Sequence, residues 1–192
     1  MKNIVKKNIQ KLKPSSTLVI NEISKELIRK GKKVYQFGFG QSPFPVPEKI
    51  VTALKDNAHK KEYLPIQGLP ELREAISNYL LKKTGTKYPK ENIIITPGSK
   101  EAMLLMHVAF NGEIILPAPS WVSYEPQAQI GLNKVHWLQT TRENNWFPSP
   151  EEVENKIQSI EKNKNIILIL NSPNNPSGTV CKNLKELANI AK

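Results

Sequence analysis

Residues Leu168–Val180, LILNSPNNPSGTV, join the most apolar run of the chain to a polar turn. The run, Ile166–Leu170, has the length and composition of a buried strand. Asparagine, serine and two prolines then follow, more turn-forming residues than a plain turn requires. Pro173 and Pro176 fix the backbone on either side of Asn174 and Asn175, so a side-chain amide is held in one orientation. The stretch predicts a buried strand that ends at a rigid polar loop.

The chain before this loop alternates between strand-like and helix-like segments. Three further strands are predicted, at Ile93–Thr96, Ile114–Leu116 and Val135–Leu138. Helices are predicted to begin near Ser99, Trp121 and Ser149, and the last has a capping box from Ser149 to Glu152. Repeated strand–helix units predict an α/β fold with a parallel sheet of four strands, covered by helices on both faces.

The ends of the sequence differ from this central part. Residues 1–13 form a basic, polar arm. Helices are predicted from Ser15 or Ser16 to Gly31, from Pro47, and after Gly68–Pro70, with a short strand at Val34–Phe37. An amphipathic helix is predicted from Asn183, and its pattern reaches Lys192. Because that helix has no further strand to cover, we expect the sequence to be the front part of a longer fold.

Composition excludes several classes of protein. The net charge is +11, but the positive residues are scattered lysines with only three arginines, Arg29, Arg73 and Arg142. Eighteen asparagines accompany them, which indicates a compositional bias rather than a nucleic-acid surface. No apolar run is long enough for a membrane span, and the N-terminus lacks a signal peptide's apolar core. A single cysteine, Cys181, favours a cytoplasmic protein, and no metal site is predicted.

Three unusual segments follow predicted strands, where ligands bind in open parallel sheets. The first is Pro97–Ala102 (PGSKEA), where the free N–H groups at the start of a helix can bind a phosphate. A Gly-Ser pair before a helix is more often a plain helix cap. The second, Pro117–Pro126, presents Trp121, either as a core or lid residue or as a flat face for a planar ring. The third is the asparagine-rich loop. Neither a P-loop nor a G-x-G-x-x-G pattern is present.

The order of these segments resembles a known family. NSPNNPSGTV is similar to the N-x-P-x-N-P-[ST]-G signature of class I/II aminotransferases, the fold-type-I pyridoxal-phosphate enzymes related to aspartate aminotransferase. YLPIQGLPELREAISNYL, IIITPGSKEAM and EIILPAPSWVSYEP resemble further family segments in the same order. The resemblance covers nearly all of residues 14–192. It implies part of a small domain at 14–46, the first part of a pyridoxal 5′-phosphate-binding large domain at 47–192, and amino-acid and 2-oxo-acid substrates.

The resemblance also implies roles for individual residues. Ser99 and Lys100 would hold the cofactor phosphate through backbone N–H groups, and Trp121 would stack on the cofactor ring. Asn175 would donate a hydrogen bond to the ring's phenolic oxygen. Tyr63 would reach the phosphate of a neighbouring subunit's cofactor, which implies a homodimer. Gly40 would let the backbone approach the substrate carboxylate.

Two features of the sequence depart from the family pattern. The loop Gly40-Gln41-Ser42-Pro43-Phe44 lacks the two acids of the Gly-Glu-Pro-Asp-Phe found in many relatives, which leaves the substrate class open. No position matches the Schiff-base lysine, the acid beside the pyridine nitrogen or the substrate-binding arginine. No catalytic residue is therefore assigned, and the chain alone is expected to be inactive.

Three interpretations remain open. The first is an aminotransferase represented by its N-terminal portion. The second is a non-catalytic product, either a gene remnant or a module that dimerises or binds a phosphate ligand. The third is a fold-type-I lyase or decarboxylase, because fold and cofactor do not fix the reaction.

Overall fold

The computed structural model describes residues 4–38, 40 and 42–191 of the chain. Gln41, in the loop from Gly40 to Phe44 singled out above, and Lys192, which the last predicted helix reaches, lie outside the described residues. Contacts divide the chain into two compact units, one of residues up to Ser15 and from Ser99 on, the other of Ser16–Gly98. The domain boundaries that the family resemblance implies, after residues 13 and 46, stay a prediction.

The first unit is built on a three-stranded parallel sheet. Its strands are β1 (Glu113–Ala118), β2 (Val135–Gln139) and β3 (Ile166–Leu168), in the order β2-β1-β3. Ile114 pairs with Val135 on one side and with Ile167 on the other. The α/β fold with a parallel sheet is confirmed, as are three of the predicted strands.

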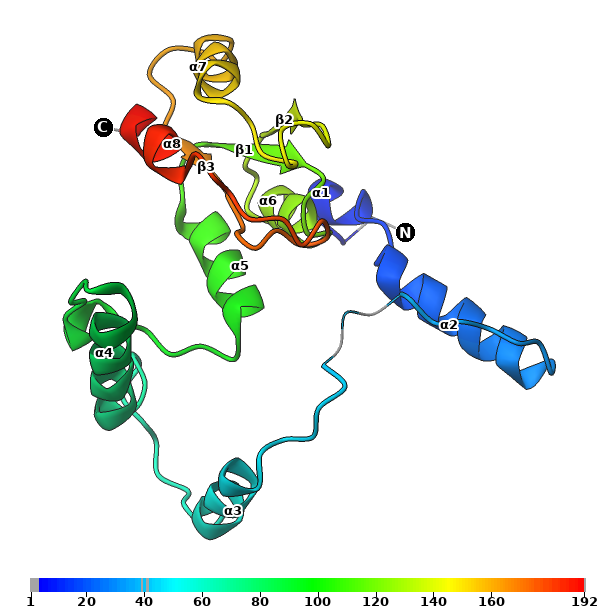
Figure 1. Cartoon of the computed structure of the whole chain (residues 1–192), viewed down its shortest axis with the longest axis vertical. Helices are drawn as coiled ribbons and strands as arrows, with labels where there is room; N and C mark the ends of the chain where they lie inside the picture. Colours follow the sequence, from blue (N-terminus) through cyan, green and yellow to red (C-terminus); the bar gives the residue numbers. More distant parts are fainter. Residues whose placement is uncertain (1–3, 39, 41, 192) are drawn as a thin grey trace. The chain divides into compact units, whose positions relative to one another are not determined.

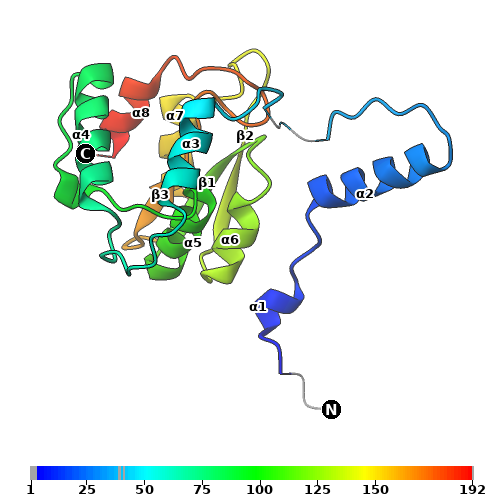
Figure 2. The same cartoon turned by 90° about the horizontal axis from the view of Figure 1, so that it is seen from below.

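Helices cover both faces of this sheet (Figures 1 and 2). On one face α7 (Pro150–Gln158) and α8 (Leu184–Ile190) pack through Val153 and Leu187 against Ile115. On the other face α5 (Ser99–Ala109) and α6 (Tyr124–Ile130) enclose Ile114 and Leu116. These three residues of β1 are fully buried, because the central strand has helices on both sides.

Local signals place the helices that cover this sheet, α5 to α8, with one exception. The capping box at Ser149 is formed, with bonds of 3.1 Å from Glu152 N to Ser149 Oγ and 2.7 Å from Ser149 N to Glu152 Oε2. The helix predicted near Trp121 begins later, at Tyr124, so that prediction is wrong by one turn. Side chains hold the backbone of residues 117–119 at the end of β1, and the chain turns at Trp121 before the helix can begin.

The second unit consists of helices and connecting segments. The predicted helices are confirmed as α2 (Ser16–Arg29), α3 (Glu48–Asn57) and α4 (Pro70–Thr84), followed by the 3-10 turn η1 (Lys90–Asn92). Arg73 on α4 is buried and donates to Gln67 Oε1 at 2.8 Å and to the Lys90 carbonyl at 3.1 Å. In the N-terminal arm, which belongs to the first unit, residues Lys7–Gln10 form a short helix, α1.

Two strand predictions are wrong. Val34–Phe37 and Ile93–Thr96 are extended segments without a ladder partner among the described residues. Ile95 N–H donates to the Gln67 carbonyl at 3.0 Å, but Gln67 lies in a turn and not in a strand. An apolar run becomes a strand only when another strand accepts its N–H groups, so the sheet has three strands rather than four.

Candidate functional site

The first turn of α5 is an open helix start. It follows Gly98, whose φ of +87° is a conformation that favours glycine. The backbone N–H groups of Ser99, Lys100 and Glu101 are the first three of α5, and the first N–H groups of a helix have no acceptor within the helix itself. Ser99 and Lys100 are both exposed. Free N–H groups and the positive end of the helix dipole together favour an anion at this point.

Lys100 connects this turn to the segment after β1. Its ammonium nitrogen lies 5.5 Å from the centroid of the Trp121 ring, within the range of a cation–π interaction. Its carbonyl accepts a 2.7 Å hydrogen bond from Nε2 of Gln127 on α6. Two loops that are 20 residues apart in sequence therefore lie side by side at the start of α5.

The segment that carries Trp121 is held at its amino-terminal end by two hydrogen bonds. Thr140 Oγ1 donates to the Ala118 carbonyl at 2.6 Å, and Ser120 Oγ donates to the Pro117 carbonyl. Trp121 packs edge to face against Tyr124, with 5.3 Å between ring centroids. Burial raises the pKa of the Tyr124 phenol, so this phenol is neutral at neutral pH. The indole is half-buried, which leaves part of it accessible to a planar ligand.

The loop after β3 contains two asparagines with different environments. Asn174 is buried, and its Nδ2 donates to Ser177 Oγ at 2.8 Å and to the Pro119 carbonyl at 3.3 Å. Asn175 is exposed; its backbone N–H donates to Asn171 Oδ1 at 2.9 Å, and its side-chain amide has no partner among the described residues. Asn174 thus connects the loop by a hydrogen bond to the segment that carries Trp121. The side-chain amide of Asn175 remains available as a hydrogen-bond donor.

The structure brings together four of the six residues singled out from the sequence. Ser99, Lys100, Trp121 and Asn175 all lie on the three segments that Gln127 and Asn174 tie to one another. Tyr63 and Gly40 belong to the second unit, where both are exposed. Their roles toward a cofactor or substrate stay predictions.

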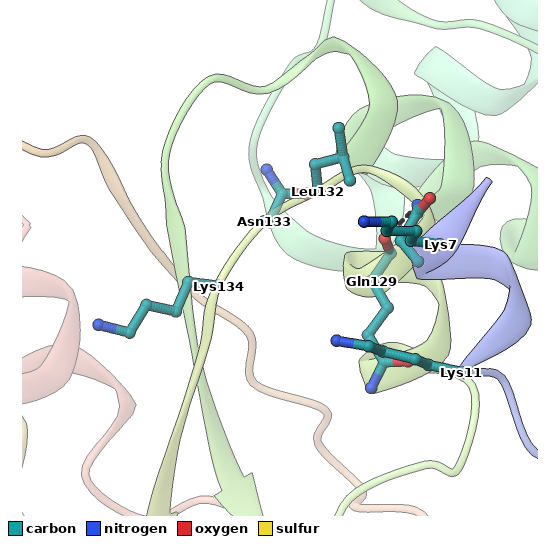
Figure 3. Close-up of a pocket in the computed structure, with 7 residues that line it drawn as sticks. Lys7, Lys11, Gln129, Leu132, Asn133 and Lys134 are labelled. Atoms are coloured by element: carbon teal, nitrogen blue, oxygen red, sulfur yellow. Dashed lines mark hydrogen bonds between the residues drawn. The ribbon is translucent and has the colours of Figure 1, made fainter.

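A hollow elsewhere in the first unit does not contain any of these residues. It has a volume of about 630 Å³ and is lined by Lys7, Asn8, Lys11, Gln129, Leu132, Asn133 and Lys134. Figure 3 shows Lys7 and Lys11 of the N-terminal arm on one side and Lys134 pointing away from them. Lys134 directly precedes β2, so the hollow lies at the amino end of that strand. Ligand sites of parallel sheets lie at the carboxyl ends, where Trp121 and Asn175 follow their strands.

Sequence reasoning missed Gln127 and the part played by Asn174. Gln127 occupies the apolar stripe of α6, in step with Tyr124, Ala128 and Gly131. A polar residue at such a position needs a hydrogen-bond partner, and this was the available signal. The sequence did not indicate the hydrogen bonds of Asn174, because the neighbouring prolines are compatible with either a free or a hydrogen-bonded side-chain amide.

Other kinds of site find no support in the described part of the chain. Within residues 4–38, 40 and 42–191, no three His, Cys, Asp or Glu side chains gather as metal ligands would. In the same residues, no helix has both the length and the apolar character that crossing a membrane requires.

The fold and the site define an α/β protein with a helix start and a flat aromatic side chain among loops at the carboxyl ends of parallel strands. The sequence profile of the family "Aminotransferase class I and II" matches residues 32–192. The chain belongs to this family.

Individual relatives agree with the profile. The chain is 35% identical to a probable aspartate/prephenate aminotransferase of Aquifex aeolicus over 96% of its own length and 47% of the relative's. It is 32% identical to the aspartate/prephenate aminotransferase of Thermus thermophilus, over 96% and 49%. The chain therefore spans about half the length of the curated relatives that it matches.

Solved structures show the same likeness. An aspartate aminotransferase from Thermus thermophilus, solved with maleate, has a TM-score of 0.87 and 31% identity over 98% of this chain and 50% of that one. An alanine aminotransferase from Pyrococcus furiosus has a TM-score of 0.85 and 26% identity, over 97% and 49%.

Proposed function

We propose that this chain supplies the cofactor-binding part of a pyridoxal-5′-phosphate-dependent aminotransferase, which moves an amino group from an amino acid to a 2-oxo acid. The observation that carries the proposal is the first turn of α5 beside the half-buried ring of Trp121, with the Lys100 ammonium 5.5 Å from the ring centroid. The cofactor has a phosphate dianion joined to a flat pyridine ring, and the site offers one group for each part. Residues and cofactor therefore fit one another.

The proposal assigns a task to each residue of the site. The N–H groups of Ser99 and Lys100 bind the phosphate, and the helix dipole favours its charge. Trp121 provides the face against which the ring stacks. The free amide of Asn175 donates a hydrogen bond to the ring's phenolic oxygen and favours its ionised form. The bound cofactor supplies an electron-withdrawing ring, and the protein's task is to orient that ring.

The second unit contributes two assignments that rest on the family resemblance. Tyr63, whose side chain is fully exposed, is assigned to the phosphate of a neighbouring subunit's cofactor, which makes the working form a homodimer. Gly40 is assigned to the substrate carboxylate; a Cβ built there would meet no atom within 4 Å. None of the lysines in these 192 residues is assigned to the covalent attachment of the cofactor.

Binding of pyridoxamine 5′-phosphate to the 192-residue chain tests this proposal. This form of the cofactor has an amine in place of the aldehyde, so it does not react with surface lysines. We expect saturable quenching of tryptophan fluorescence that is lost in Trp121→Leu and kept in the control Trp137→Phe on β2. Equal quenching in both variants, or no saturable binding, would contradict the proposal.

The Asn175 assignment has its own test. Asn175→Ala is expected to weaken binding of pyridoxamine 5′-phosphate about threefold to tenfold, because one hydrogen bond is lost. Asn155→Ala, at an exposed position of α7, is the matched control and should leave binding unchanged. Unchanged binding in Asn175→Ala would remove Asn175 from the site while leaving the phosphate and ring contacts in place.

Amino transfer is the second readout. With pyridoxal 5′-phosphate, aspartate and 2-oxoglutarate, the chain alone is expected to give no turnover, because none of its lysines is assigned to the covalent attachment of the cofactor. Turnover by the purified chain would show that one of its own lysines does this work, and lysine-to-alanine variants would then identify it.

A further inference from the structure

Gln127 is buried between α6 and the start of α5. Its side chain is 6% exposed, and its Nε2 donates the 2.7 Å bond to the Lys100 carbonyl. Its Oε1 is also buried and has no hydrogen-bond partner among the described residues. Burying an unpaired oxygen is unfavourable, and a methionine of similar length would fill the same space without it. Packing alone therefore does not account for a glutamine here.

The bond acts on one particular peptide unit. The carbonyl of Lys100 and the N–H of Glu101 belong to the same planar group, so fixing one fixes the other. In a helix these two groups point in opposite directions along the axis, the carbonyl toward the C-terminus and the N–H toward the N-terminus. By holding the Lys100 carbonyl, Gln127 aims the Glu101 N–H at the free end of α5.

The far end of the same pair of helices is fixed independently. A Cβ on Gly131 would lie 2.4 Å from the His107 carbonyl, so α5 and α6 approach each other as only a glycine allows. Asn133 Nδ2, just beyond α6, donates to the carbonyls of Phe110 and Gly112 at 2.9 and 3.2 Å. With this end held by backbone contact, Gln127 is the side chain that sets the orientation at the other end.

We propose that Gln127 is a positioning residue that orients the Glu101 N–H at the start of α5 toward the cofactor phosphate, where it adds a donor to the N–H groups of Ser99 and Lys100. This inference rests on the function proposed above. It goes further by naming a side chain on α6, outside the phosphate-binding turn, on which phosphate affinity depends. Gln127 does not itself contact the cofactor in this proposal.

The test compares two ligands that differ only in the phosphate. Dissociation constants of pyridoxamine 5′-phosphate and pyridoxamine are measured with the 192-residue chain, and their ratio reports the contribution of the phosphate. In Gln127→Met we expect the preference for the phosphorylated ligand to fall about threefold to tenfold, the size of one hydrogen bond. Binding of pyridoxamine should change less than about twofold, because the ring contacts remain.

Two further variants make the result specific. Gln127→Asn keeps the amide but is one methylene shorter, so it cannot reach the Lys100 carbonyl. This variant should show the same loss of preference for the phosphorylated ligand. It replaces Gln127→Met in the test if Gln127→Met does not fold. Gln129→Met, on the same helix, is the control and should keep the wild-type ratio.

The outcomes separate the two proposals. A wild-type preference for the phosphorylated ligand that survives in a folded Gln127→Met or Gln127→Asn overturns the role of Gln127 and leaves the proposed function standing. A weakening of both ligands by the same factor also overturns it, since that result indicates general loss of structure. A wild-type chain with no phosphate preference overturns the phosphate site, and the inference with it.

Discussion

The two units of the chain use amphipathic helices in different ways. In the first unit α5 to α8 lie on a sheet, and Ile114, Ile115 and Leu116 of the central strand are fully buried. In the second unit α2 and α3 have no buried residue, and Ile23 on α2 is 52% exposed. Both units carry the same helical pattern of apolar residues. The difference shows that the pattern is sufficient for a helix, whereas burial requires a surface for the helix to cover.

The largest expected difference between the two units comes from replacing one isoleucine of each unit by alanine. Ile115→Ala should lower the free energy of unfolding by about 2–5 kcal/mol, because it leaves a cavity between β1 and the helices α7 and α8. Ile23→Ala should lower it by less than about 1 kcal/mol, since half of that side chain is already in water. Urea denaturation followed by tryptophan fluorescence and far-UV circular dichroism measures both. Equal losses would mean that the two units do not differ in packing.

A smaller effect is expected from adding one methyl group to a glycine in each unit. Gly131→Ala places a Cβ against the His107 carbonyl, and we expect a loss of about 1–3 kcal/mol from overpacking α5 on α6. Gly85→Ala, after α4, meets no atom within 4 Å and should cost about 1 kcal/mol through its φ of +74° alone. Thermal unfolding midpoints compare the two. A larger loss at Gly85 would contradict close packing as the property that distinguishes the first unit.

The smallest effect concerns acid stability. His107 on α5 is fully buried, and neither ring nitrogen has a hydrogen bond of ordinary geometry to the described residues. Burial lowers the pKa of His107, an effect that the Asn133 side chain partly offsets. Below pH 6.5 the unfolded chain therefore binds a proton that the folded chain does not.

Stability should consequently fall as the pH decreases from 6.5 toward the folded pKa, by up to about 1.4 kcal/mol per pH unit, and then level off. The free energy of unfolding of wild type and His107→Leu, measured between pH 5 and 8, checks this. The difference between the two should be constant above pH 7 and shift in favour of the variant below pH 6. Parallel pH profiles would show that His107 does not link protonation to folding.

Several parts of the structure could be predicted from sequence because their signals are local. The capping box at Ser149, the helix after Ser16 and the helix after Pro70 each depend on residues within one or two turns. The open helix start at Ser99 and the rigid loop around Pro173 and Pro176 belong to the same class. Local backbone conformation and nearby hydrogen bonds decide all of them.

The strands and the details of the site depended on distant residues. Ile93–Thr96 is as apolar as Ile114–Leu116, but only the second run has neighbouring strands to accept its N–H groups. Asn174 and Asn175 are adjacent and chemically identical, and the carbonyl of Pro119 determines which of them is buried.

The sequence by itself determined the helices, the α/β class and the polar loops, because each rests on contacts between residues close in the chain. The tertiary structure decided which apolar runs pair as strands, which asparagine amide stays free, and that Gln127 holds the start of α5. These outcomes depend on hydrogen-bond partners 20 to 55 residues away, from Ile114 N–H and the Lys134 carbonyl to Asn174 and the Pro119 carbonyl. The identity of such a partner is fixed only when the sheet and its helices have assembled.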